Sequence, residues 1–128
     1  MSLLNFARQR AFESRGRNLT QLISKVPGVL GSAKTIAEKR DVGMELLDRY
    51  DGNNCRELER FLFYKEKAYA RNLIHIEGAF SLMVLTWPGG ILSPLHGHTS
   101  QGCWVKVIRG TMRERVYKLE EDGLPVLR

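Results

Sequence analysis

The chain changes its pattern of hydrophobic and polar positions near residue 70. Before that point, hydrophobic residues recur at the three- and four-residue spacing of amphipathic helices. In NLTQLISKV, Asn18 is placed to cap a helix and Pro27-Gly28 to end it. We expect a second helix over AKTIAEKR, capped by Ser32, with VGMELLDRY following before the turn signal at 51–54.

The last helical segment of this half is CRELERFLFYKEKAYA. Its apolar side is expected to belong to the core and consists of Leu58, Phe61, Leu62 and Tyr69.

After Arg71 the pattern is typical of strands. The segments RNLIHIE, FSLMVLTW, CWVKVIRG and MRERVYK are short, rich in β-branched and aromatic residues, and separated by Gly, Pro or Glu-Gly breaks. Only Gly-Thr separates the last two, which predicts a hairpin. The expected fold class is therefore mainly β with N-terminal helices, the strands forming an antiparallel meander.

Composition indicates one globular domain, since the chain has 128 residues of which 43% are hydrophobic. Two cysteines, Cys55 and Cys103, do not suggest a disulfide scaffold, and a reducing, cytoplasmic environment is expected. No segment has the length and apolarity of a membrane span or a signal peptide.

The positive charge is confined to the beginning of the chain. Residues 1–40 hold eight basic and two acidic side chains, which gives +6, and the remaining 88 residues hold twelve of each sign. The arm over 1–17 is either a solvated tail or, because it is rich in Arg, a mitochondrial targeting segment. Nucleic-acid binding is disfavoured because no aromatic platform or recognised module accompanies the arm.

The chemically distinctive segment is SPLHGHTSQGC, in which His96 and His98 are one residue apart. In a strand their imidazoles would lie on the same face, and the pair would then suit a transition metal. Such a pair alone is also common by chance or for structural reasons. The spacing G-x5-H-x-H-x4-C-x6-G, from Gly90 through Cys103 to Gly110, makes a ligand role more credible.

This spacing resembles the first conserved motif of the cupin superfamily. A cysteine at position 103, where most cupins have a metal-binding glutamate, narrows the resemblance to the cysteine dioxygenase family. The similarity covers residues 69–117 and implies a jelly-roll β-barrel. The helical first half is compatible with that family.

The resemblance implies roles for individual residues. His96 and His98 match the first two iron ligands, Arg71 the arginine that holds the substrate carboxylate, and Tyr69 the adjacent active-site tyrosine. Cys103 matches the cysteine that forms a thioether with a downstream tyrosine in eukaryotic-type members. Two further positions, Leu85 and Trp87, match residues that line the pocket.

The residues themselves leave alternatives open. A guanidinium facing a barrel lumen requires an anion and suits a carboxylate, but Arg71 is otherwise expected in a rim salt bridge. Imidazoles suit iron, zinc, copper and nickel, so the choice of Fe(II) rests on the resemblance. Cys103 is alternatively an inert thiol packed beside Trp104, and Leu85 and Trp87 are alternatively plain core residues.

The sequence departs from the family pattern at several positions. Gly97 replaces a usual aspartate, which would weaken support for the histidines, and Gly102 replaces a common histidine. The family's third iron-binding histidine and its cross-linking tyrosine lie in a second motif that is not found here, and Tyr117 does not match that tyrosine. We expect 128 residues to be a fragment, truncated after the first cupin motif. His75 is a candidate third ligand only if no bulge separates it from Arg71; otherwise it is a strand or surface histidine.

The sequence thus predicts a single domain with a basic arm at 1–17, a helical region at 18–70 and the first half of a cupin barrel at 71–128. As the resemblance implies, L-cysteine would bind one Fe(II) through its thiolate and amine, with Arg71 holding its carboxylate. Both atoms of O2 would pass to sulfur, giving cysteine sulfinate. No nucleic-acid or membrane partner is expected, and the full-length protein would be a monomer. The alternatives are an inactive cupin fragment with a binding or regulatory role, and more distantly a zinc or nickel cupin enzyme.

Overall fold

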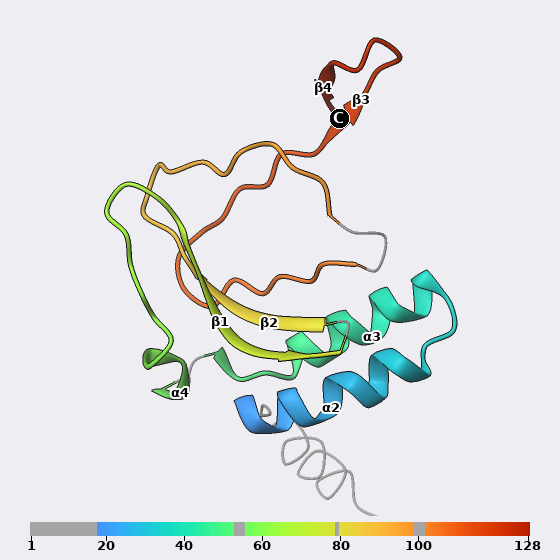
Figure 1. Ribbon diagram of the computed structural model, residues 1–128, viewed down its shortest axis with the longest axis vertical. Helices are drawn as coiled ribbons and strands as arrows, with labels where there is room; N and C mark the ends of the chain where they lie inside the picture. The colour runs from blue at the N-terminus through green and yellow to red at the C-terminus, as the bar shows by residue number, and fades with distance from the viewer. Residues whose placement is uncertain (1–17, 53–55, 79, 99–101) are drawn as a thin grey trace, which may run out of the picture.

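The computed structural model describes residues 18–52, 56–78, 80–98 and 102–128. The basic arm at 1–17 and Cys55 lie outside these residues. Figure 1 shows helices α2 (Leu19–Ser32) and α3 (Ile36–Asp48) side by side beneath a hairpin of β1 (Ala70–Glu77) and β2 (Phe80–Thr86). A short helix, α4 (Arg56–Glu59), precedes the hairpin. A second hairpin, β3 (Tyr117–Leu119) and β4 (Pro125–Leu127), stands away from the helices.

Helix α2 begins where the sequence predicts and ends later. The Asn18 side chain accepts a hydrogen bond from the Gln21 backbone N–H at 2.9 Å, and the Gln21 side chain accepts one from Asn18 N–H at 3.1 Å, which confirms the cap. The predicted stop at Pro27-Gly28 is wrong, because the helix continues to Ser32. Proline removes one backbone donor from a helix, and here Val26 and Val29 on either side of it still pack against the core.

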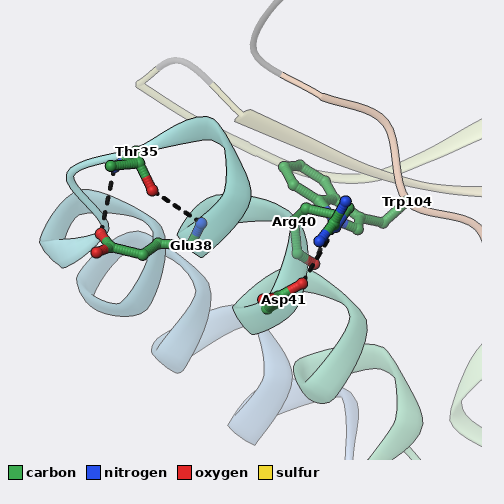
Figure 2. Close-up of polar contacts among 5 residues, drawn as sticks. All are labelled: Thr35, Glu38, Arg40, Asp41 and Trp104. Carbon is green, nitrogen blue, oxygen red and sulfur yellow. Dashed lines mark hydrogen bonds and ion pairs between the residues drawn. The ribbon is translucent and has the colours of Figure 1, made fainter.

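The expected cap of the second helix is also corrected. The N-cap of α3 is Thr35, whose hydroxyl accepts from Glu38 N–H at 3.1 Å while the Glu38 carboxylate accepts from Thr35 N–H at 3.2 Å (Figure 2). Ser32 cannot form this reciprocal pair, because the residue three positions after it is Thr35 and not Glu or Gln.

The third predicted helix is much shorter than its hydrophobic pattern suggested. After α4, Phe61 N–H and Leu62 N–H bond to carbonyls three residues earlier, at 2.9 and 3.1 Å, and the helix is not continued. Leu58 is buried and Phe61 packs against the core, whereas Tyr69 lies just before β1. The expected four-residue apolar side is therefore not formed.

The core lies between the helices and the first hairpin. Its buried hydrophobic residues come mainly from the helical half and are Leu19, Leu22, Leu46, Tyr50 and Leu58. From the sheet, Ile74, Leu82 and Val84 pack against this cluster. Because side chains alternate across a strand, Met83 and Leu85 face away from the helices, together with Arg71 and Leu73, which are opposite Leu85 and Met83.

Strands β1 and β2 confirm two of the predicted strands, but the later ones differ from expectation. No strand is assigned to residues 102–116, so within the described part of the chain the expected hairpin of CWVKVIRG with MRERVYK is not formed. Tyr117–Leu119 pairs instead with Pro125–Leu127. Residues 103–109 keep an alternation of burial typical of a strand, yet they lack a paired backbone partner among the described residues.

These elements fit a small β-rich fold with N-terminal helices. The sheets are the two-stranded pairs β1–β2 and β3–β4, and the described residues form no closed barrel. Within the described residues, no helix combines the length and the hydropathy needed to cross a membrane.

Candidate active site

An aromatic pair marks the end of the first hairpin. Tyr69 directly precedes β1 and Trp87 directly follows β2, and because Ala70 is paired with Thr86, these two residues come opposite each other. Their rings stack with centroids 4.4 Å apart and an interplanar angle of 17°. The Trp87 indole N–H donates to the Ile91 carbonyl at 2.7 Å, which fixes the ring on the turn that leads toward the histidines.

Arg71 extends this aromatic pair into a polar cluster. Its Nη2 donates to the Tyr69 hydroxyl at 3.3 Å, and its Cζ lies 5.6 Å from the centre of the Tyr69 ring. The rim salt bridge considered from the sequence is not formed with any described carboxylate. Arg71 is exposed and lies opposite Leu85, which is 44% exposed, so Leu85 is not a core residue in this structure. The arrangement offers guanidinium donors beside an apolar side chain and a stacked aromatic pair.

His96 and His98 lie on an exposed stretch that is assigned neither helix nor strand. Their ring centroids are 5.1 Å apart, in an edge-to-face arrangement. The Nδ1 of His96 is 2.8 Å from the Pro94 carbonyl oxygen, which can only accept, so Nδ1 is the donor, and in the neutral imidazole Nε2 then has the lone pair. A backbone carbonyl on the second ring nitrogen is a common way of orienting a metal-binding histidine.

Cys103 is exposed and not buried beside Trp104. The Trp104 side chain points to the other side of the segment, where its indole N–H donates to the Arg40 carbonyl of α3 at 3.1 Å (Figure 2). The alternative of an inert thiol packed against Trp104 is therefore not what the structure contains.

His75 does not lie on the face that carries Arg71. The β1–β2 register shifts between Leu73 and His75, so that His75 is opposite Leu82, a residue whose side chain faces the helices. Its Nε2 is 3.2 Å from the Glu77 carboxylate, and its ring lies 5.9 Å from the ring of Phe80. The bulge therefore violates the condition under which His75 was a candidate ligand, and it is a strand histidine.

The sequence-predicted residues thus form two groups. Tyr69, Arg71, Leu85 and Trp87 gather at the end of the hairpin, and His96 and His98 form a separate pair. Within the described residues, no group of three or more His, Cys, Asp or Glu is placed to hold a metal ion. The two imidazoles fit two positions of a divalent metal site, and a third protein ligand has not been identified among the described side chains.

Sequence reasoning missed the lysine that anchors the segment after the histidines. Lys106 Nζ donates to three carbonyl oxygens at the end of α3, those of Leu47 at 2.9 Å, Asp48 at 3.1 Å and Tyr50 at 2.6 Å. The sequence held a signal for this contact, since Lys106 alternates with Trp104 and Ile108 on the same face of an otherwise apolar stretch. A lysine on the inward face of such a stretch needs acceptors.

Comparison with known proteins gives a consistent result. The family model described as cysteine dioxygenase type I matches residues 11–124. Cysteine dioxygenase type 1 of Bos taurus is 28% identical over 102 residues, which cover 79% of this chain and 49% of that protein. The proteins of the same name from Homo sapiens and Danio rerio are 34% and 32% identical over 73 residues, or 56% of this chain and 36% of each relative.

These matches concern only part of each relative. The chain spans between about a third and a half of the length of the curated relatives it matches. No solved structure matches the chain significantly.

Proposed function

Since the chain belongs to the cysteine dioxygenase type I family, we propose that it functions in the Fe(II)-dependent oxidation of L-cysteine by O2 to cysteine sulfinate. The observation that carries this proposal is the cluster of Arg71, Tyr69 and Trp87 at the end of the β1–β2 hairpin. It presents guanidinium donors next to an aromatic pair on the face that points away from the helices.

Arg71 is proposed to bind the substrate carboxylate. A guanidinium forms two parallel hydrogen bonds to a carboxylate, and the hydrogen bond to the Tyr69 hydroxyl orients the group before substrate binds. Leu85 and Trp87 would supply the apolar wall along the substrate carbons. A thiol without a carboxylate, such as cysteamine, would not use this contact, which favours cysteine as the substrate.

His96 and His98 are proposed to supply two of the iron ligands. The Pro94 carbonyl supports this role, because it holds His96 in the tautomer that leaves Nε2 available. Iron bound by them would supply the redox chemistry that joins O2 to sulfur. A further protein ligand is required from outside the described residues, and we propose that another part of a cupin fold would provide it.

Cys103 is proposed to be the thioether cysteine. Its thiol is exposed on the side of its segment opposite the inward-facing Trp104 and Lys106. In the proposed protein it would be linked to a tyrosine that the described residues do not include.

Reconstitution of the protein with Fe(II) under anaerobic conditions, followed by L-cysteine and O2, tests the activity. We expect cysteine sulfinate as the product, with two oxygen atoms from O2 when labelled oxygen is used. The matched variant His96→Ala should lose the activity, whereas His75→Ala should keep it, because His75 lies beyond the bulge. Absence of sulfinate from the iron-loaded protein, or activity that survives His96→Ala, contradicts the proposal.

A second candidate function is a non-catalytic cupin-family protein with a binding or regulatory role. It is favoured by one observation, the lack of a third metal ligand among the described side chains. Metal analysis of the purified chain separates the two. Iron well below one equivalent, with no turnover, supports the second candidate.

A further inference from the structure

The segment that carries Cys103 contacts the helical layer through three residues at alternate positions. Trp104 donates to the Arg40 carbonyl at 3.1 Å, Lys106 reaches the end of α3, and Ile108 packs against the core. The intervening residues face the other side, where Val105 and Val107 are 61% and 48% exposed. The segment is not paired with another strand among the described residues. The backbone hydrogen bonds that usually fix which side chains of a strand face inward are therefore not present there.

Lys106 makes the most specific of these contacts. The last carbonyls of a helix have no partner within the helix, and they form the negative end of its dipole. Helix α3 has no basic residue in its own last turn. The ammonium group has three donors, and the carbonyls of Leu47, Asp48 and Tyr50 accept one each, at 2.9, 3.1 and 2.6 Å.

Trp104 and Ile108 fit against glycines on either side of this lysine contact. A Cβ atom added at Gly43 of α3 would overlap the indole of Trp104, and one added at Gly52 would come within 2.8 Å of the Ile108 side chain. These close approaches allow the segment to lie directly on the helix and the turn after it. They are apolar, however, and a shift of the chain by one residue would bring Val105 or Val107 into the same places. Neither valine has a side-chain donor for the three carbonyls that Lys106 meets.

We propose that Lys106 is a positioning residue that selects which face of the segment carries Cys103. Lys106 is held at the end of α3. The residues that alternate with it, which include Cys103, therefore lie on the side away from the helices, as do Arg71 and Leu85. The consequence for catalysis rests on the proposed function, but the placement itself does not, and the two are tested separately.

Thiol accessibility measures the placement directly. In a Cys55→Ser, Cys103→Ser background, single cysteines are introduced as Val105→Cys on the exposed face or Ile108→Cys on the helix-facing side. Their labelling rates with Ellman's reagent are compared under native conditions. We expect Val105→Cys to react about tenfold faster or more, because Val105 is 61% exposed, whereas Ile108 is only partly exposed and packs against the core.

Lys106 is then replaced in Lys106→Met, which keeps most of the length of the side chain and removes its donors. We expect the contrast between the two cysteines to fall to about threefold or less. Lys106→Arg keeps the charge and should restore part of the contrast. Lys65→Met, at an exposed lysine between α4 and β1, is the matched control and should leave the contrast unchanged.

The outcomes separate positioning from general stability. The proposal is overturned if Lys106→Met lowers the midpoint of denaturant unfolding but leaves the labelling contrast intact. If Lys106→Met does not fold, Lys106→Gln and Lys106→Arg decide, since equal contrasts in these two variants also overturn it. Absence of sulfinate formation by the unsubstituted protein, together with a contrast that falls as expected in Lys106→Met, would instead count against the proposed function alone, so the two failures are distinguishable.

Discussion

At the residue scale, the orientation of Arg71 leads to a prediction about substrate affinity. The guanidinium donates to the Tyr69 hydroxyl and lies on the exposed face of β1, so a substrate carboxylate would meet its remaining donors. Arg71→Met removes a charge-assisted contact, which is worth about 1.5–3 kcal/mol. We therefore expect KM for L-cysteine to rise roughly 10- to 100-fold.

Arg71→Lys provides the matched control for charge. Lysine keeps the charge but cannot form the two parallel hydrogen bonds, so KM should still rise, by less than in Arg71→Met. Turnover of cysteamine, which has no carboxylate, should change little in both variants. An equal loss for cysteine and cysteamine would show that Arg71 supports the fold and not the substrate. Steady-state kinetics measures these effects, with sulfinate formation followed for cysteine and hypotaurine formation for cysteamine.

At the element scale, the cap of α3 distinguishes the sequence prediction from the structure. Thr35, and not Ser32, forms the reciprocal cap of α3 with Glu38. Thr35→Ala should lower the free energy of unfolding by about 1 kcal/mol. Ser32→Ala should cost less than about 0.5 kcal/mol, because Ser32 only donates to the Val29 carbonyl at the end of α2. Urea unfolding followed by circular dichroism measures the difference, and a larger loss for Ser32→Ala would contradict the assignment.

The contact of α3 with Trp104 predicts opposite effects for two glycines. Gly31→Ala in α2 has open space around the new methyl group and should raise stability by about 0.5–1 kcal/mol. Gly43→Ala places its methyl group in the Trp104 indole and should lower stability by about 1–3 kcal/mol despite the better helix propensity. In a Trp87→Phe background, Gly43→Ala should also shift Trp104 emission to longer wavelength. Stabilisation by both substitutions would show that Trp104 does not lie on α3.

The same elements show how far the sequence could predict the fold. The start of α2 and the strands β1 and β2 follow local patterns, because caps and alternation depend on residues close in sequence, whereas the roles expected for Tyr69, Arg71 and Trp87 came from the family resemblance. The end of α2, the short α4 and the extended stretch at 102–116 depend on packing and on backbone partners. The bulge that turns His75 away from Arg71 has no signal in the sequence. A single extra residue in one strand reverses the side to which every later side chain points, and it leaves the strand-like composition of the segment unchanged.

At the scale of the whole molecule, burial is unevenly distributed. Buried hydrophobic residues lie between the helices and the inward side of the first hairpin, whereas the opposite side of the hairpin and the adjacent segment stay exposed. The apolar residues of this outward face are Leu73, Met83, Leu85, Val105 and Val107, each at least 40% exposed. An apolar face of this kind on a small protein marks an interaction surface or an aggregation liability.

The outward face therefore predicts how the 128-residue chain behaves in solution. We expect concentration-dependent self-association in sedimentation velocity and binding of the dye ANS, both reduced in the double variant Leu73→Gln, Val105→Gln. Ile36→Gln is the matched control, because Ile36 is 74% exposed at the start of α3 and outside the face, and it should change neither measurement. If the chain is instead a monomer at all concentrations, unfolds cooperatively and binds no dye, then the outward face is covered in solution. Equal reductions in the control and the double variant would assign the association to exposed apolar residues in general and not to this face.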